Sequence, residues 1–206
     1  AGLPIRAVAL GRPLFTPGMD DAARVREMEA VAAEADGFGI GGLEAFGLGP
    51  LQQLRAILGD GLLAIHLAES PRETARCLAE HGETEIVRAL RAAPDLMVHL
   101  THATPHDLDL LAARGQQAVF CPRSNMALAD GIPPLAGAYT RGWPVALGSD
   151  NMMISSPDLF SEMDTASRLA RAQTLQADAI DCPTLLRAAT VDGARALRLD
   201  GQLGQL

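Results

Sequence analysis

The sequence predicts an α/β fold of the (β/α)8 TIM-barrel type, with about six parallel strands and flanking helices. Short apolar runs alternate along the chain with amphipathic helical patterns, as in repeated strand–helix units. The runs are continuous stretches of Val, Ile, Leu and Ala, which is typical of parallel strands buried on both faces. The candidate strands are Ile5–Leu10, Gly37–Gly41, Leu62–His66, Leu96–Leu100, Ala118–Cys121 and Val145–Gly148.

The segments between these runs carry apolar residues three and four positions apart. Between residues 20 and 35, Val25, Met28 and Val31 form one stripe with charged residues opposite, which predicts a helix. Gly115 is a typical stop signal for the helix that precedes it. Further helices are predicted from Pro71 to Gly82, from Glu83 to Ala93, from Asp107 to Arg114 and from Pro157 to Arg171.

Polar side chains follow the apolar runs at the points where the strands end. His66 and Glu69 end one run, His99 or His102 ends the next, and Asn125 and Asp150 follow the last two. Because the carboxyl ends of barrel strands share one edge, we expect these groups to lie close together there. Imidazole nitrogens and carboxylate oxygens are zinc ligands. The pattern therefore predicts a metal-dependent hydrolase.

Four motifs in the same order resemble those of the amidohydrolase superfamily. They are HLAES at 66–70, VHLTHAT at 98–104, CPRSNMALADGIPPL at 121–135 and VALGSDN at 145–151. The chain is most similar to the branch of cytosine deaminase-like enzymes, chlorohydrolases and adenosine-analogue (S-adenosylhomocysteine-type) deaminases. The resemblance implies one divalent metal ion, Zn²⁺ or else Fe²⁺. It also implies hydrolysis of a C–N bond in a nucleobase, nucleoside or related N-heterocycle, with loss of ammonia.

The resemblance also implies a role for each of these side chains. His66 and Asp150 are expected to be metal ligands, and metal binding brings the pKa of water to about 7. Glu69 is expected to have a raised pKa through partial burial and to carry protons between water, substrate and ammonia. Asp150 would accept the proton of the attacking water. The resemblance favours His99 over His102 as the histidine that polarises the substituent of the attacked carbon or steadies the hydroxide, and with Glu69 it would contact the substrate.

Two further residues are predicted on the substrate side of the site. Asn125 and the Ser124–Asn125 turn that follows CPR are expected to shape the substrate side of the pocket. Arg123 could bind a substrate carboxylate or phosphate, or be a solvated loop cation. On the last long helix, Glu162 and Asp164 are expected to form a solvated face rather than part of the site.

The number of strands is too small for a closed barrel, which has eight in about 250 residues. In the family the VALGSD motif ends the eighth strand, so Ile5–Leu10 would be the third. The first strand of these enzymes ends in a His-x-His pair that supplies two metal ligands, and the sequence contains no such pair. We therefore expect residues 1–206 to be a partial barrel domain, without the first two strands and the β-sandwich domain, and inactive by itself.

Composition limits the other classes of function. The net charge of −8 argues against a nucleic-acid-binding surface. No apolar run is long enough for a membrane span. Three widely spaced cysteines favour a reducing, cytoplasmic location. The sequence predicts a small-molecule substrate as the partner and leaves a homo-oligomer open.

Two alternatives remain. The first keeps fold and metal but acts on another bond, as an amidase, cyclic-imide hydrolase or chlorohydrolase. Many of these enzymes carry a carboxylated lysine on the fourth strand, whereas here Glu44 follows the run from Gly37 to Gly42. The second alternative is an inactive barrel fragment with a structural role, whose open sheet would expose two edges.

Overall fold

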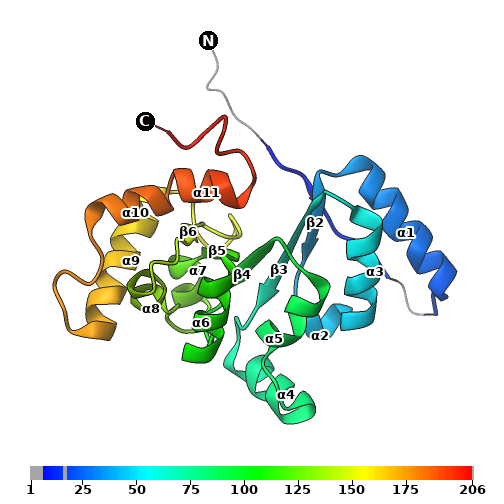
Figure 1. Ribbon diagram of the computed structural model, residues 1–206, viewed down its shortest axis with the longest axis horizontal. Coiled ribbons are helices and arrows are strands. Elements are labelled where there is room, and N and C mark those ends of the chain that lie inside the picture. Colours follow the sequence, from blue (N-terminus) through cyan, green and yellow to red (C-terminus); the bar gives the residue numbers. More distant parts are fainter. Residues whose placement is uncertain (1–6, 16–17, 206) are drawn as a thin grey trace.

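The computed structural model describes residues 7–15 and 18–205 and contains an open, six-stranded parallel sheet (Figure 1). The strands pair in sequence order, so β1 and β6 are the two edges of this sheet. This confirms the predicted fold class and the incomplete closure. The strands are β1 (Leu10–Gly11), β2 (Gly37–Ile40), β3 (Leu62–Leu67), β4 (Leu96–His99), β5 (Gln117–Phe120) and β6 (Ala146–Leu147).

Five of the six predicted strands are confirmed to within one residue at either end. The exception is the first, predicted over Ile5–Leu10. Its residues 5 and 6 lie outside the described part of the chain, and the strand that forms is Leu10–Gly11. Gly11 packs so closely on α1 (Asp21–Glu34) that an added Cβ would lie 2.3 Å from the Val31 side chain. A strand at this position therefore brings the helix directly onto the sheet.

The predicted helices form with local end signals. Asp20 caps α1 by accepting from the Ala23 amide, and α4 (Pro71–His81) ends at the left-handed Gly82. The helix predicted from Glu83 to Ala93 is α5 (Glu85–Ala89) followed by a 3-10 turn. The other helices are α2 (Leu43–Phe46), α3 (Leu48–Leu58), α6 (Pro105–Arg114), α7 (Pro122–Ala127), α8 (Leu135–Thr140), α9 (Leu159–Thr174), α10 (Cys182–Ala188) and α11 (Val191–Ala196).

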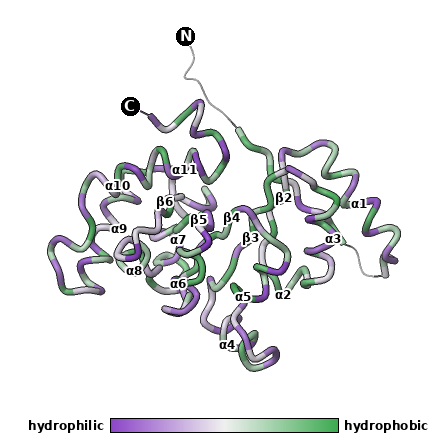
Figure 2. Tube along the Cα trace, viewed as in Figure 1, coloured by the Kyte–Doolittle hydropathy of each residue, from purple (hydrophilic) through white to green (hydrophobic). Residues whose placement is uncertain are grey.

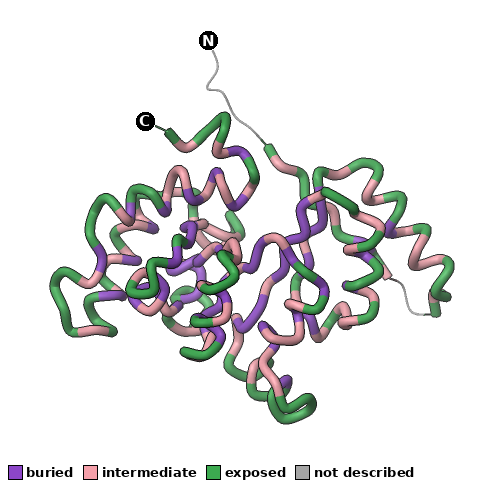
Figure 3. Tube along the Cα trace, viewed as in Figure 1, coloured by how far each residue is buried: buried purple, intermediate pink, exposed green. Residues whose placement is uncertain are grey.

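The core lies between the sheet and the helices packed on its outer face. Figure 3 shows buried residues concentrated in the central strands and exposed ones on the outer helices, where Figure 2 shows hydrophobic and hydrophilic residues alternating. Leu63, Ile65 and Phe120 are completely buried on the helix side. Phe120 meets Trp143 edge-to-face at 6.4 Å between ring centroids. This packing fixes the strands, and with them the positions of the side chains at their ends.

The opposite face of the sheet carries a smaller apolar cluster. Ala64, Leu96 and Ala146 form a second apolar cluster together with Ala196 of α11, which lies against β5 and β6. Among helices of the described segments, none is both long and apolar enough to cross a membrane.

Candidate active site

Three strands leave the sheet at the same edge through residues in the left-handed conformation. Ala68 has φ 48° after β3, His99 has φ 71° at the end of β4, and Asp150 has φ 58° after β6. This conformation costs a non-glycine residue about 1–2 kcal/mol. Strain of this kind collects at functional sites, where the surrounding contacts hold it in place. Here it turns the chain so that polar side chains point back over the strand ends.

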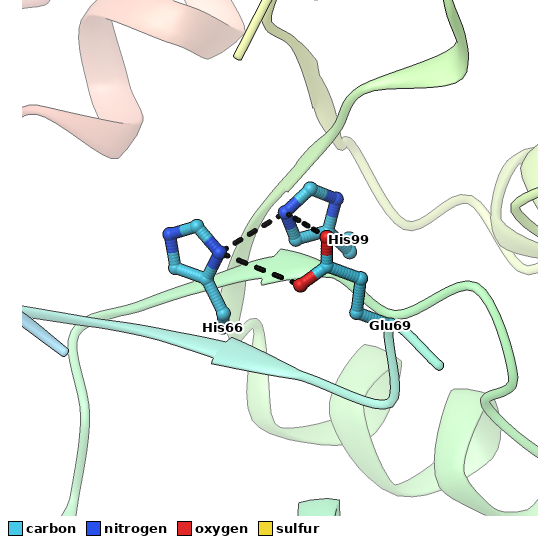
Figure 4. A group of neighbouring side chains, drawn as sticks. All are labelled: His66, Glu69 and His99. Carbon is cyan, nitrogen blue, oxygen red and sulfur yellow. Dashed lines mark hydrogen bonds and ion pairs between the residues drawn. The ribbon is translucent and has the colours of Figure 1, made fainter. Parts of the chain in front are cut away.

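His66, Glu69 and His99 form a compact cluster at this edge (Figure 4). His66 Nδ1 lies 3.1 Å from His99 Nε2. The Glu69 carboxylate faces both rings, with one oxygen 3.7 Å from His66 Nδ1 and the other 3.5 Å from His99 Nε2. His66 ends β3, and Glu69 reaches the same place because the left-handed Ala68 lies between them.

Asn125 of α7 and Thr101, in the turn after β4, hold the ring of His99 in place. The ring is 1% exposed, and its Nδ1 lies 3.0 Å from Asn125 Oδ1, which can only accept a hydrogen bond. With the amide in this orientation His99 Nδ1 is the donor. The Asn125 amide nitrogen donates in turn to the Thr101 hydroxyl, so both ends of the amide have a partner. His99 Nε2 is the ring nitrogen that faces His66 and Glu69.

The pKa of Glu69 is lowered, and the predicted rise is wrong. The polar contact with His66 lowers this pKa, and the positive potential of His99 adds to it; together they outweigh the rise caused by partial burial. Proximity to two imidazoles thus decides the charge of the carboxyl group. Glu69 is therefore ionised at neutral pH, and as a carboxylate it is a proton acceptor, although the lowered pKa makes it a weaker base than an isolated glutamate.

Asp150 lies at the same edge, after β6, but outside the cluster of His66, Glu69 and His99. Its carboxylate accepts a hydrogen bond of 2.5 Å from the Ser124 hydroxyl on α7. Ser124 is fully buried, while Asp150 is only partly buried. Neighbouring residues of α7 thus contact both halves of the site, with Ser124 on Asp150 and Asn125 on His99.

The structure places Arg123 away from the cluster. Its guanidinium donates to the Ser156 carbonyl at 3.0 Å and lies 3.5 Å from Glu162 of α9, whose carboxylate also accepts from the Arg123 amide. Glu162 is completely buried, so the prediction that it is solvated is wrong, whereas Asp164 is exposed and paired with Arg168. Burial raises the pKa of Glu162. Substrate binding by Arg123 and by Asn125 stays a prediction.

We expect Glu162→Ala to destabilise the fold by about 3 kcal/mol, the lower end for breaking a buried ion pair. The Arg123 guanidinium would keep the Ser156 carbonyl but lose its charged partner. Asp164→Ala, on the same helix, is the matched control and should change stability by less than about 0.5 kcal/mol. Chemical denaturation measures both values, and equal small effects would contradict the role of Glu162.

The cluster has the chemistry of a metal site. One potential ligand atom from each of His66, Glu69 and His99 lies within 4.8 Å of the others. Two imidazoles and a carboxylate suit Zn²⁺. Asp150 would have to complete such a site from β6.

Sequence reasoning missed the residues that hold the predicted ones in place. Ser124 and Thr101 contact Asp150 and Asn125, and Glu85 accepts a hydrogen bond from the Ala68 amide. The Ser124–Asn125 turn was predicted on the substrate side of the pocket, but the contact of Ser124 with Asp150 was not. Thr101 and Glu85 are distinguished only by tertiary contacts.

Comparison with known proteins gives a family-level match over most of the chain. Residues 24–206 match the amidohydrolase family. A 5-methylthioadenosine/S-adenosylhomocysteine deaminase of Syntrophobacter fumaroxidans is 40% identical over 70% of this chain and 34% of its own length. A protein of the same name from Halobacterium salinarum is 33% identical over 97% of this chain and 50% of its own length.

Solved structures of deaminases have a similar fold. An adenosine deaminase from Xanthomonas campestris with bound zinc is 28% identical, with a TM-score of 0.81 over 90% of this chain and 45% of its own. Guanine deaminase from C. acetobutylicum, 18% identical, has a TM-score of 0.76 and shows the fold alone. The chain thus spans between about a third and a half of the length of these relatives.

Proposed function

The chain belongs to the amidohydrolase family, and from this premise we propose that it is part of a metal-dependent aminohydrolase. Its substrate would be an aminated nucleobase, nucleoside or related N-heterocycle. The observation that carries the proposal is the cluster of His66, Glu69 and His99 at the carboxyl edge of the sheet. Relatives named as deaminases of adenosine analogues support the class of substrate. Because the chain spans at most about half of these relatives, the proposal concerns the whole protein.

We propose that His66 and Asp150 hold the metal ion, with zinc favoured by the donor types. When bound, the ion would supply a water of lowered pKa as nucleophile. This assignment keeps Glu69 and His99 for proton work, which their mutual contacts favour. The buried Ser124 hydroxyl orients the Asp150 carboxylate.

Glu69 would move protons during the reaction. As an ionised carboxylate it accepts a proton from the attacking water and donates it to a ring nitrogen or to departing ammonia. His99, held by Asn125, would donate or accept at its Nε2 beside the carbon under attack. Asp150 would take the second proton of the water, so that between them the two carboxylates supply one proton to the ring nitrogen and one to the amino group, which leaves as ammonia. Two carboxylates in different surroundings can thus do separate work.

The test is an ammonia-release screen with the intact enzyme. Aminated purines, pyrimidines and their nucleosides are compared with amides, lactones and chlorinated triazines. We expect turnover of an aminated ring, with one ammonia released for each oxo product formed. Turnover confined to amides and lactones, or to chlorinated rings, would instead assign the site to another bond in the same family.

A further inference from the structure

Glu85 is a buried carboxylate near the candidate site that the proposed chemistry does not use. It lies at the start of α5, and the residue is 3% exposed. One of its oxygens accepts from the Ala68 amide at 3.2 Å and from the Thr74 hydroxyl at 3.3 Å. Glu85 therefore connects α5 and α4 to the turn between His66 and Glu69.

The turn at Ala68 depends on contacts from outside its own strand. Ala68 has φ 48° and follows the last residue of β3, and its amide donates to Glu85. Its carbonyl accepts from the His102 amide at 2.9 Å, beyond the end of β4. Both peptide groups of Ala68 are therefore satisfied in a conformation that costs about 1–2 kcal/mol for a residue with a Cβ.

Structural stability alone is a weak reason for a carboxylate at this position. Within the described residues, Glu85 makes no ion pair, while the nearby Arg88 pairs with Glu44 at 2.7 Å. Burial raises the pKa of Glu85, and the neighbouring acids Glu73 and Glu44 add to the rise. Burying a carboxylate without an ion partner costs free energy. Glu85 is nevertheless buried where its oxygen accepts from the backbone amide of Ala68, in the turn between His66 and Glu69.

We propose that Glu85 is a positioning residue, which holds the Ala68 amide and so fixes the turn that directs Glu69 towards His66 and His99. This inference rests on the proposed role of Glu69 as proton carrier. Movement of a catalytic group by about 1 Å can cost on the order of 10²-fold in rate. Loss of the acceptor should therefore lower kcat, with little effect on KM or on metal content.

Four variants of the intact enzyme test the proposal. Glu85→Gln keeps an acceptor of the same length, whereas Glu85→Leu removes it. Glu85→Asp keeps the charge, but its side chain is one methylene too short to reach the Ala68 amide. It replaces the leucine variant in the test if that variant fails to fold. Thr74→Val removes the second donor and leaves the Ala68 bond in place, which makes it the matched control.

The decisive readout is hydrogen exchange of the Ala68 amide, followed by NMR without substrate. We expect exchange at least about tenfold faster with Leu or Asp, and wild-type exchange with Gln and in Thr74→Val; a tenfold change corresponds to about 1.4 kcal/mol of local opening. On whichever substrate the screen identifies, kcat should fall roughly ten- to hundredfold with Leu or Asp only.

Unchanged exchange at Ala68 in both the Leu and the Asp variants would overturn the proposal, whatever the activity. Fast exchange with wild-type kcat would overturn it as well, because the turn would then not control Glu69. Failure of the proposed deaminase chemistry is a separate outcome, seen as turnover of amides or chlorinated rings while the exchange results stand.

Discussion

Glu69→Gln is expected to lower turnover by about 10²- to 10⁴-fold, the usual contribution of a positioned acid–base group. Glutamine keeps the size of the side chain and can still contact His66 and His99, which lie 3.7 and 3.5 Å from its carboxylate oxygens. It cannot accept and return a proton. Metal content should remain that of the wild type, because Glu69 is not one of the proposed ligands.

The measurement is kcat and zinc per protein for the intact enzyme. Glu73→Gln is the matched control, since Glu73 is an exposed glutamate in the first turn of α4, four residues further along. It should leave both values unchanged. A loss of less than about threefold in Glu69→Gln, well below the range for acid–base catalysis, would reject Glu69 as the proton carrier.

The sheet and the edge that carries the site were predictable because parallel strands have a simple signal. Apolar runs that end in polar residues predicted β3, β4 and β6, and the structure places His66, His99 and Asp150 where these strands end. The residues around the strand ends could be found in the same way. Their mutual distances could not, because they depend on how the chain turns after each strand.

Those turns carry no local signal in the sequence. Ala68, His99 and Asp150 adopt left-handed conformations, which are most common for glycine and asparagine. Long-range contacts impose them instead, as with Glu85 on the Ala68 amide, 17 positions along the chain. The predicted rise in the pKa of Glu69 was wrong for a related reason. It counted burial and left out the positions of the two imidazoles.

The pair of Arg123 and Glu162 also depends on long-range packing that could not be predicted from the sequence. Glu162 belongs to an amphipathic helix, and its neighbour Asp164 is exposed as predicted. Only the packing of α9 on α7 shows that Glu162 faces inwards and meets Arg123, which is 39 positions away in the chain. Charged residues on amphipathic helices are usually exposed to solvent. The burial of Glu162 therefore becomes visible only once the position of α9 on the rest of the fold is known.

Asp150→Asn is expected to lower both turnover and metal retention. Asparagine keeps the shape and the hydrogen bond from Ser124 but removes the negative charge that would help to hold a divalent cation. Partners that merely hydrogen-bond to metal ligands change metal affinity by about 10- to 100-fold. Loss of a ligand charge should therefore exceed that range, and Ser124→Ala, which only frees the Asp150 carboxylate, should fall within it.

Zinc affinity in chelator-buffered solution and kcat of the intact enzyme measure these effects. Zinc affinity should fall most in Asp150→Asn and less in Ser124→Ala. Asp164→Asn, on the exposed face of α9, is the control and should leave both zinc affinity and kcat unchanged. Glu69→Gln loses turnover and keeps zinc, so the two carboxylates separate in one experiment. Wild-type zinc affinity in Asp150→Asn together with lost turnover would remove Asp150 from the ligand set and leave it a role in proton transfer alone.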